Sequence, residues 1–331
     1  MEGRALRFVA PRRVEIHRVE ARHPAPGEVL VRTRWSGISG GTELLAYRGE
    51  LDEHLELDET LGSLAGSTFR FPFAYGYSCV GEVEESRVEV LAEGARVFAF
   101  HPHQDRFTVG AGDVMAIEGV DGRIATLFPL VETALQVSLD AGPRIEEPVV
   151  VLGLGAVGML TAALLHRSGA DVIGADLRRD RRELAAAFGI RALDVTDLRD
   201  AVATSTSGAG VPLVVDATGS PGGLPLALEL LAHEGEALVC SWYGSKEVRL
   251  PLGGAFHRRR LQIRSTQVST IPARLSARWD VARRRRAAMR LLTELPLKLL
   301  ASHEIAFERA AAAYAALDRG DEGVVHVALT Y

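Results

Sequence analysis

The glycine-rich segment Gly153–Gly158 (GLGAVG) has the residue types that a dinucleotide phosphate site requires. It directly follows the apolar run Val149–Leu152 and opens a helical pattern, which is the context that gives such a motif its meaning. Gly153 permits the tight turn, Gly155 lets the backbone approach a pyrophosphate, and Gly158 allows close helix–strand packing. The free N–H groups at the helix N-terminus then bind the phosphates. The cofactor contacts predicted here are Gly153, Gly155, Ala156, Val157 and Gly158.

A second signal for the same site is Asp176, which ends the next short strand of the sequence pattern. A carboxylate at that point accepts a hydrogen bond from the ribose 2′-OH of NAD and repels the 2′-phosphate of NADP. Because Arg178 and Arg179 are near enough to pair with a 2′-phosphate, NADP stays open as an alternative to NAD. Further along, the segment Asp216–Gly219 (DATG) follows another predicted strand, and we expect Thr218 within it to contact the cofactor.

The densest polar cluster outside the glycine-rich turn is Phe100–Asp105 (FHPHQD). A histidine with an ordinary pKa near 6.5 is a natural general base, so His101 and His103 are candidate catalytic residues. A surface loop with two solvated imidazoles is an equal alternative. A metal site is disfavoured because a convincing third ligand is missing.

Aromatic residues alternate perfectly between residues 69 and 77. If this segment is extended, a period of two places all five rings on one face. Core packing is the favoured explanation, and a wall for a flat, apolar substrate is the alternative. The rings belong to Phe69, Phe71, Phe73, Tyr75 and Tyr77.

The elements that must position these residues follow two patterns. Residues 1–100 show strand and turn signals, such as Val29–Thr33 and Cys79–Val83, around the acidic stretch Glu50–Thr60, which is a solvated helix or lobe. From about residue 127, short apolar strands alternate with helical segments, which indicates a doubly wound parallel sheet. The last part, from about residue 266, contains two helices and a final strand, at 281–293, 308–318 and 324–330.

Composition narrows the class of protein. The chain has 331 residues, 47% of them hydrophobic and 24% charged, as in an ordinary globular protein of about two domains. A formal charge of −5 argues against a nucleic-acid partner. Two cysteines cannot build a disulfide framework. No signal peptide or membrane span is evident, so we expect a cytoplasmic protein with a small-molecule substrate and no membrane partner.

The order of these features resembles the medium-chain dehydrogenase/reductase superfamily over essentially the full length. Besides the glycine-rich turn, the resemblance rests on Pro26–Val31 (PGEVLV), Ser36–Ile38 (SGI), Gly81–Val83 (GEV) and the tail Gly323–Tyr331. It implies an α/β protein: a GroES-like β-rich catalytic domain plus a Rossmann domain, with the active site in the cleft between them and a homodimer as the assembly. The expected domains are 1–128 (catalytic), 129–265 (Rossmann) and 266–331 (return to the catalytic domain).

Zinc-dependent members of this superfamily carry three metal ligands that can be compared residue by residue. A Cys after the Ser-Gly-Ile stretch corresponds here to Ser39, and the His of a Gly-His-Glu motif corresponds to Tyr77. The third ligand falls on Phe128. Catalytic zinc needs ligands from Cys, His, Asp or Glu, so the sequence predicts an enzyme without zinc. The stretch Ser36–Glu43 (SGISGGTE) is similar to a narrower group, the zinc-independent bacteriochlorophyllide a dehydrogenase-like members.

The resemblance also implies roles for individual residues. Thr42 and Glu43 occupy the turn where family members place a proton-relaying hydroxyl, and Thr42 is either that relay or a simple turn hydroxyl. Tyr77 either donates to the substrate oxygen or fills the vacated ligand space. His326 sits where a basic residue often approaches the cofactor phosphates.

The leading hypothesis is an NAD(P)-dependent dehydrogenase acting on a secondary alcohol or ketone, on a conjugated or ring-bearing substrate that stabilises charge in place of zinc. The alternatives are an NADPH-dependent quinone or enone reductase and a nucleotide-binding protein without turnover.

Overall fold

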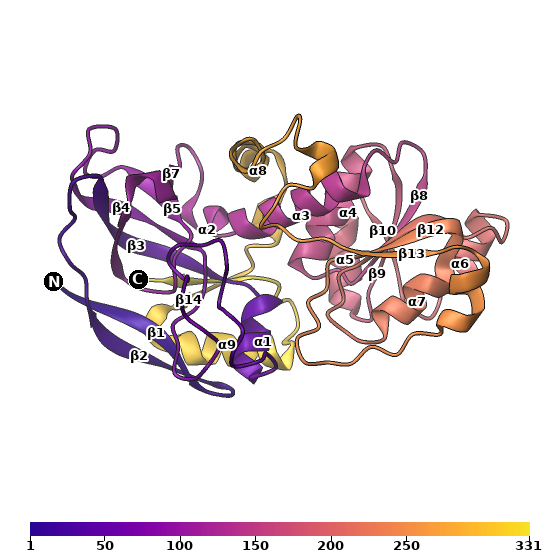
Figure 1. Ribbon diagram of the computed structural model, residues 1–331, viewed down its shortest axis with the longest axis horizontal. Helices are drawn as coiled ribbons and strands as arrows, with labels where there is room; N and C mark the ends of the chain where they lie inside the picture. Colours follow the sequence, from indigo (N-terminus) through magenta and orange to yellow (C-terminus); the bar gives the residue numbers. More distant parts are fainter. The chain divides into compact units, whose positions relative to one another are not determined.

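The chain forms two compact units, and the computed structural model describes all of residues 1–331. The first unit contains residues 1–129 together with 292–331, and the second contains residues 130–291 (Figure 1). Both ends of the chain therefore build the first unit. No helix is both long enough and apolar enough to cross a bilayer.

The second unit is built on a six-stranded parallel sheet with the strand order β10-β9-β8-β11-β12-β13. That order corresponds to 3-2-1-4-5-6 of the doubly wound dinucleotide-binding fold, so the predicted Rossmann architecture is confirmed. The strands are β8 (Pro148–Leu152), β9 (Asp171–Ala175), β10 (Arg191–Leu193), β11 (Val211–Asp216), β12 (Leu231–Val239) and β13 (Gln262–Ser265). The helices are α3 (Phe128–Ala141), α4 (Ala156–Arg167), α5 (Arg179–Ala187), α6 (Leu198–Ser205), α7 (Gly223–Leu230) and α8 (Val281–Glu294).

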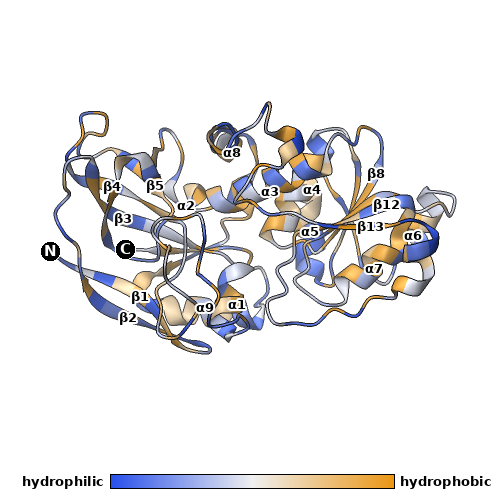
Figure 2. Ribbon diagram, viewed as in Figure 1, coloured by the Kyte–Doolittle hydropathy of each residue, from blue (hydrophilic) through white to orange (hydrophobic).

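The apolar sequence of β8 explains its central place in this sheet. Residues 149–152 are all at most 1% exposed, and the strand pairs with β9 on one side and β11 on the other. A strand that is covered on both faces is a continuous apolar run, as in parallel sheets generally. Figure 2 shows the same hydrophobic character along much of α7, which packs against β11 and β12.

The first unit is dominated by a mostly antiparallel sheet with the path β14-β15-β3-β4-β5-β7, in which only β14 and β15 run parallel and to which β6 adds by pairing with β3. A separate ribbon is formed by β1 and β2. The strands are β1 (Glu2–Ala10), β2 (Arg13–Glu20), β3 (Glu28–Ile38), β4 (Cys79–Ser86), β5 (Arg96–Ala99), β6 (Arg106–Gly110), β7 (Val114–Ala116), β14 (His303–Ala306) and β15 (Val327–Thr330). The helices are α1 (Thr42–Arg48), α2 (Gly122–Ala125) and α9 (Ala310–Arg319).

The terminal strand β15 lies antiparallel to β3, with Val327 opposite Ile38. This pairing brings the last residues of the chain beside the turn that follows β3. The β-rich architecture expected for the catalytic domain is therefore present, and it is assembled from both ends of the chain as expected.

The second boundary between the units differs from the expected one at 265/266, because residues 266–291 group with the parallel-sheet unit. The buried side chain of Arg284 in α8 explains this. Its guanidinium donates to Glu132 at 3.0 Å and to Gln136 at 2.6 Å, both on α3. In the first unit, the acidic stretch 50–60 contains turns and bends rather than a helix, with one isolated bridge between Glu56 and Thr68.

Candidate functional site

The glycine-rich turn between β8 and α4 gives each of its glycines a different steric task. Gly153 has φ +85°, and a Cβ there would lie 2.7 Å from the carbonyl oxygen of Ala217. A Cβ on Gly158 would lie 1.9 Å from the Gly153 carbonyl oxygen, so only glycine permits this helix–strand contact. A Cβ on Gly155 would meet nothing within 4 Å. The turn is thus close-packed at two glycines and open at the one where a pyrophosphate would approach.

The start of α4 adds hydrogen-bond donors to this open space. Gly155 is the N-cap and provides no side-chain cap, and the first helical residues are Ala156 and Val157. The first N–H groups of a helix have no partner within the helix and carry the positive end of its dipole. The donor set and the open backbone therefore fit a dinucleotide diphosphate.

Asp176 lies just after β9, and both of its carboxylate oxygens are held by backbone N–H groups. Oδ2 accepts from Leu154 at 2.7 Å and Oδ1 from Arg178 at 2.8 Å. The bond to Leu154 ties the carboxylate to the glycine-rich turn itself. A carboxylate fixed beside this turn is suited to a ribose hydroxyl.

The arginines near Asp176 are engaged with other groups. The guanidinium of Arg178 pairs with Asp180, with Nε donating at 3.0 Å, and that of Arg179 pairs with Glu183 at 2.7 Å. These contacts occupy the side chains that the sequence offered as partners for a 2′-phosphate.

Thr218 is positioned by the fully buried Asp216 at the end of β11. Oδ1 of Asp216 accepts from the Thr218 backbone N–H at 3.0 Å and from its hydroxyl at 2.7 Å. The same oxygen accepts from Ser241, and Oδ2 accepts from Tyr243. Asp216 thus connects the end of β11 with the segment that follows β12. The hydrogen bonds from Ser241 and Tyr243 to Asp216 were not predicted from the sequence.

In the first unit, Glu43 and His103 form a buried pair, and both side chains are completely inaccessible to solvent. The Glu43 carboxylate accepts from His103 Nε2 at 2.9 Å, from the Ser39 backbone N–H at 2.8 Å, and from the hydroxyl of Tyr314. Three donors on one carboxylate satisfy a charge that would be costly to bury alone.

The chain of hydrogen bonds continues on the other side of the imidazole. His103 Nδ1 lies 2.7 Å from the Ser36 hydroxyl, which lies 2.8 Å from the hydroxyl of Tyr331. A neutral imidazole satisfies both contacts when Nε2–H donates to the carboxylate and Nδ1 accepts from Ser36. Gly76, with φ +103°, makes room for this ring, because a Cβ there would lie 2.6 Å from it.

Tyr77 forms a second polar cluster with Ser39 and Thr42, the first residue of α1. Burial and the negative charge of Glu43 raise the pKa of the Tyr77 phenol to about 12, while hydrogen bonds with the Ser39 and Thr42 side chains act in the opposite direction. The phenol is therefore a protonated donor at neutral pH. The Ser39 and Thr42 side chains, from the turn after β3 and the start of α1, thus lie near enough to the phenol to influence its pKa.

Ser39 and Tyr77 are two of the positions at which the family resemblance places zinc ligands, and their side chains lie near each other. The third, Phe128, is fully buried, with its ring 4.9 Å from that of Phe98. No group of three or more His, Cys, Asp or Glu side chains has a geometry that could hold a metal ion. Two hydroxyls and a phenyl ring do not fit the ligand chemistry of a catalytic zinc ion.

The other predicted histidines have buried contacts of their own. The His101 ring stacks on Phe107 at 3.8 Å, and its Nδ1 lies 2.9 Å from the Pro102 carbonyl oxygen. His326 is 1% exposed, and its Nε2 lies 2.9 Å from the Thr126 hydroxyl. Burial lowers the pKa of each ring to about 4, so both are neutral.

The alternating aromatic segment is not a strand. Phe69, Phe73 and Tyr75 are buried in the core of the first unit, and the other two rings are partly buried against it. Phe73 stacks on Phe8 at 5.1 Å, and Tyr77 meets Tyr75 edge-on at 6.0 Å. The favoured explanation, core packing, accounts for these three buried rings.

Comparisons with known proteins were made for the whole chain. Residues 156–283 match a family model described as zinc-binding dehydrogenase. The chain is 26% identical over 285 residues to (R,R)-butanediol dehydrogenase of Bacillus subtilis, an alignment that covers 74% of this chain and 79% of that protein. It is 25% identical over 262 residues to 2-desacetyl-2-hydroxyethyl bacteriochlorophyllide A dehydrogenase of Cereibacter sphaeroides, with 73% and 75% covered. A solved alcohol dehydrogenase from Escherichia coli CFT073, complexed with NADH, has a TM-score of 0.79 at 19% identity, covering 100% of this chain and 99% of that one.

Proposed function

Because the chain belongs to the medium-chain dehydrogenase/reductase superfamily and is an oxidoreductase of the alcohol dehydrogenase type, we propose that it interconverts a secondary alcohol and a ketone without a catalytic zinc ion. The observation that carries this proposal is the hydroxyl cluster of Tyr77, Ser39 and Thr42. It stands where zinc ligands stand in the zinc-dependent members. The protein would then act on the substrate oxygen with hydrogen bonds instead of a Lewis acid.

NAD is the proposed cofactor, and when bound it accepts or supplies the hydride. The open face of Gly155 and the first N–H groups of α4 would hold its diphosphate. Asp176 would accept a hydrogen bond from the ribose 2′-OH. A preference for NAD over NADP is supported by that carboxylate and by the ion pairs that Arg178 and Arg179 form with acidic side chains.

The proposed role of Tyr77 is to donate a hydrogen bond to the substrate oxygen. Oxidation of a carbinol removes a hydride from carbon and a proton from oxygen, so negative charge builds on that oxygen when the proton leaves early. A donor placed there stabilises the charge. With a pKa raised to about 12, the phenol keeps its proton at neutral pH and suits this role. Thr42, which is partly exposed, would accept the carbinol proton while its own hydroxyl proton passes to solvent water.

A conjugated or ring-bearing substrate fits this chemistry. Zinc normally contributes several kcal/mol by stabilising the alkoxide, and without it the substrate must share the charge. A carbinol attached to a conjugated ring does so, because the ring stabilises positive character on carbon as hydride leaves. The same donor also suits hydride addition to an enone, but the NADPH preference expected for such a reductase is opposed by Asp176. A homodimer remains a prediction from the family resemblance.

The test combines metal analysis, cofactor titration and turnover on one purified sample. We expect less than 0.1 zinc ion per chain, saturable NADH binding that is tighter than NADPH binding, and oxidation of ring-bound secondary alcohols that survives dialysis against a chelator. Stoichiometric zinc whose removal abolishes turnover would contradict the metal-free mechanism. Tighter binding of NADPH, with enone reduction, would establish the reductase instead.

A further inference from the structure

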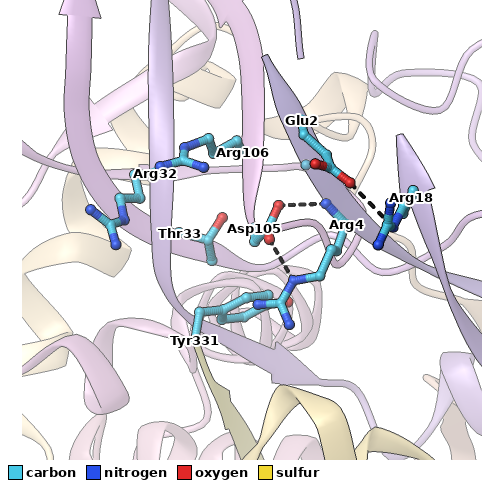
Figure 3. A pocket seen from close by; sticks show the side chains of 9 residues that line it. Glu2, Arg4, Arg18, Arg32, Thr33, Asp105, Arg106 and Tyr331 are labelled. Atoms are coloured by element: carbon cyan, nitrogen blue, oxygen red, sulfur yellow. Dashed lines mark hydrogen bonds and ion pairs between the residues drawn. The ribbon is translucent and has the colours of Figure 1, made fainter. Parts of the chain in front are cut away.

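A hollow lies in the first unit between the β1–β2 ribbon and strands β3 and β6 (Figure 3). Its volume is about 370 Å³. Four guanidinium groups line it, from Arg4, Arg18, Arg32 and Arg106, together with the carboxylates of Glu2 and Asp105. Two more carboxylates, Glu308 and Glu84, bind Arg4 at 2.6 Å and Arg106 at 2.8 Å, so the four guanidiniums are balanced by four carboxylates, 4 − 4 = 0.

The strand registers place these arginines against one another in pairs. Arg4 lies directly opposite Arg18 in the β1–β2 ribbon, and Arg32 lies directly opposite Arg106 between β3 and β6. Directly opposed residues of an antiparallel pair project from the same face, and like charges in that position destabilise the pairing. Carboxylates offset most of this repulsion, because Arg4, Arg18 and Arg106 each have an acidic partner, which leaves Arg32 as the guanidinium without one.

The carboxylates near the hollow bind three of the guanidiniums but leave some of the N–H donors of each available. Arg4 donates through Nε to Asp105 at 2.8 Å and through Nη1 to Glu308 at 2.6 Å, which leaves Nη2. Arg106 donates through Nε and Nη2 to Glu84, which leaves Nη1. Arg18 is paired through Nε with Glu2 at 3.1 Å. Each therefore keeps N–H donors for another acceptor.

Arg32 differs from the other three because it has no acidic partner. Its side chain is exposed. The carboxylate opposite it on β4, Glu82, is instead bound by Arg34 at 2.7 Å. All five of its N–H donors remain for an anion, and a guanidinium binds carboxylate or phosphate oxygens in a bidentate manner.

We propose that this hollow is a binding site for a small polyanion, a metabolite that carries a phosphate or diphosphate group or several carboxylates. The size fits a small molecule, and Arg32 together with the remaining N–H groups of Arg4, Arg18 and Arg106 supplies the donors. The site shares no residue with the hydroxyl cluster or the glycine-rich turn, and Tyr331, which lines it, also contacts Ser36 in the hydrogen-bonded chain around His103.

The test uses the full chain with saturating NADH, so that the glycine-rich turn cannot bind the probe. Inorganic pyrophosphate and citrate are titrated separately by calorimetry at low ionic strength, and the tighter probe identifies the phosphate or carboxylate class. We expect one equivalent of at least one probe to bind. Arg32→Gln should weaken that binding at least tenfold. The control is Arg70→Gln, which changes an exposed arginine of the same unit outside the hollow.

A second measurement separates a binding role from a structural one. Without the probe, Arg32→Gln should unfold at the same temperature as the unchanged protein or higher, because a like-charge pair is relieved. With the probe, the unchanged protein should gain thermal stability and the variant should not. Absence of saturable binding of both probes, or equal weakening by Arg32→Gln and Arg70→Gln, would overturn the proposal.

Discussion

Replacing Tyr77 by Phe removes one hydroxyl group from the proposed oxygen-binding cluster and leaves the ring against Tyr75. The change should cost little folding stability, because the ring keeps its packing and the phenol is only partly buried. The effect on catalysis should be larger. A donor aimed at an oxygen that gains charge in the transition state contributes about 10²- to 10³-fold to kcat. KM should change little, because the uncharged ground-state oxygen needs the donor less.

The pH dependence gives an independent reading of the same variant. The pKa of Tyr77 is raised to about 12, so the donor stays protonated throughout the range from about pH 6 to pH 10. Ketone reduction should therefore show no decline from loss of this proton below pH 10. A decline in ketone reduction centred near pH 10, the ordinary pKa of tyrosine, would contradict this if it is absent in Tyr77→Phe. The pKa of the phenol would then not be raised by burial and by the charge of Glu43.

The assay is steady-state ketone reduction followed by NADH absorbance, with Tyr75→Phe as the matched control. Tyr75 is two residues away and only 2% exposed, and its ring lies in the same core cluster. We expect Tyr75→Phe to keep kcat within about threefold. A Tyr77→Phe enzyme with kcat within twofold of the unchanged protein would refute the role assigned to the phenol.

Three further predictions concern the cofactor site and the two histidines whose pKa is lowered. Gly155→Ala should keep the melting temperature but weaken NADH binding at least tenfold, whereas Gly158→Ala should lower the melting temperature, because its Cβ would lie 1.9 Å from a backbone oxygen. Asp176→Ala should weaken NADH binding, measured by fluorescence titration, by about 10- to 100-fold and NADPH binding by less, since a hydrogen bond to a charged acceptor contributes about 1.5–3 kcal/mol. His101 and His326 have folded-state pKa values lowered from 6.5 to about 4. The unfolded chain binds more protons in that window, so stability is present above pH 6.5 and is lost as the pH falls toward 4. Each histidine adds a slope of at most about 1.4 kcal/mol per pH unit, and His326→Gln should reduce the slope measured by urea unfolding.

The parallel-sheet unit could be predicted well from sequence because its signals are local. The run Val149–Leu152 is buried on both faces as its apolar character indicates, and the steric tasks of the three glycines follow from their spacing. The domain boundary near residue 291 has no such local signal. It depends on the contact between Arg284 and Glu132, which are 152 residues apart, and an arginine cluster usually indicates a solvated helix face.

The hydrogen-bonded chain around Glu43 could be predicted only in part. Glu43 and His103 were candidates by residue type, but their contact joins positions 60 residues apart. Tyr331 and Tyr314 reach the chain from 295 and 271 residues away. No periodicity encodes such distances, since they depend on the pairing of β15 with β3 and on the packing of α9. The one available signal for Tyr314 was its place as a single aromatic residue in an alanine-rich helix.

The burial of Glu43 and His103 argues for a positioning role rather than direct proton transfer. Both side chains are completely inaccessible, and every acceptor and donor between them has a protein partner. Glu43 holds the Ser39 backbone N–H and directly follows Thr42, so it fixes the turn that presents both hydroxyls to Tyr77. Its charge also raises the pKa of the Tyr77 phenol. A buried carboxylate with three donors is thus a means of keeping one nearby hydroxyl protonated and well placed, which is what a site that binds a substrate oxygen without zinc requires.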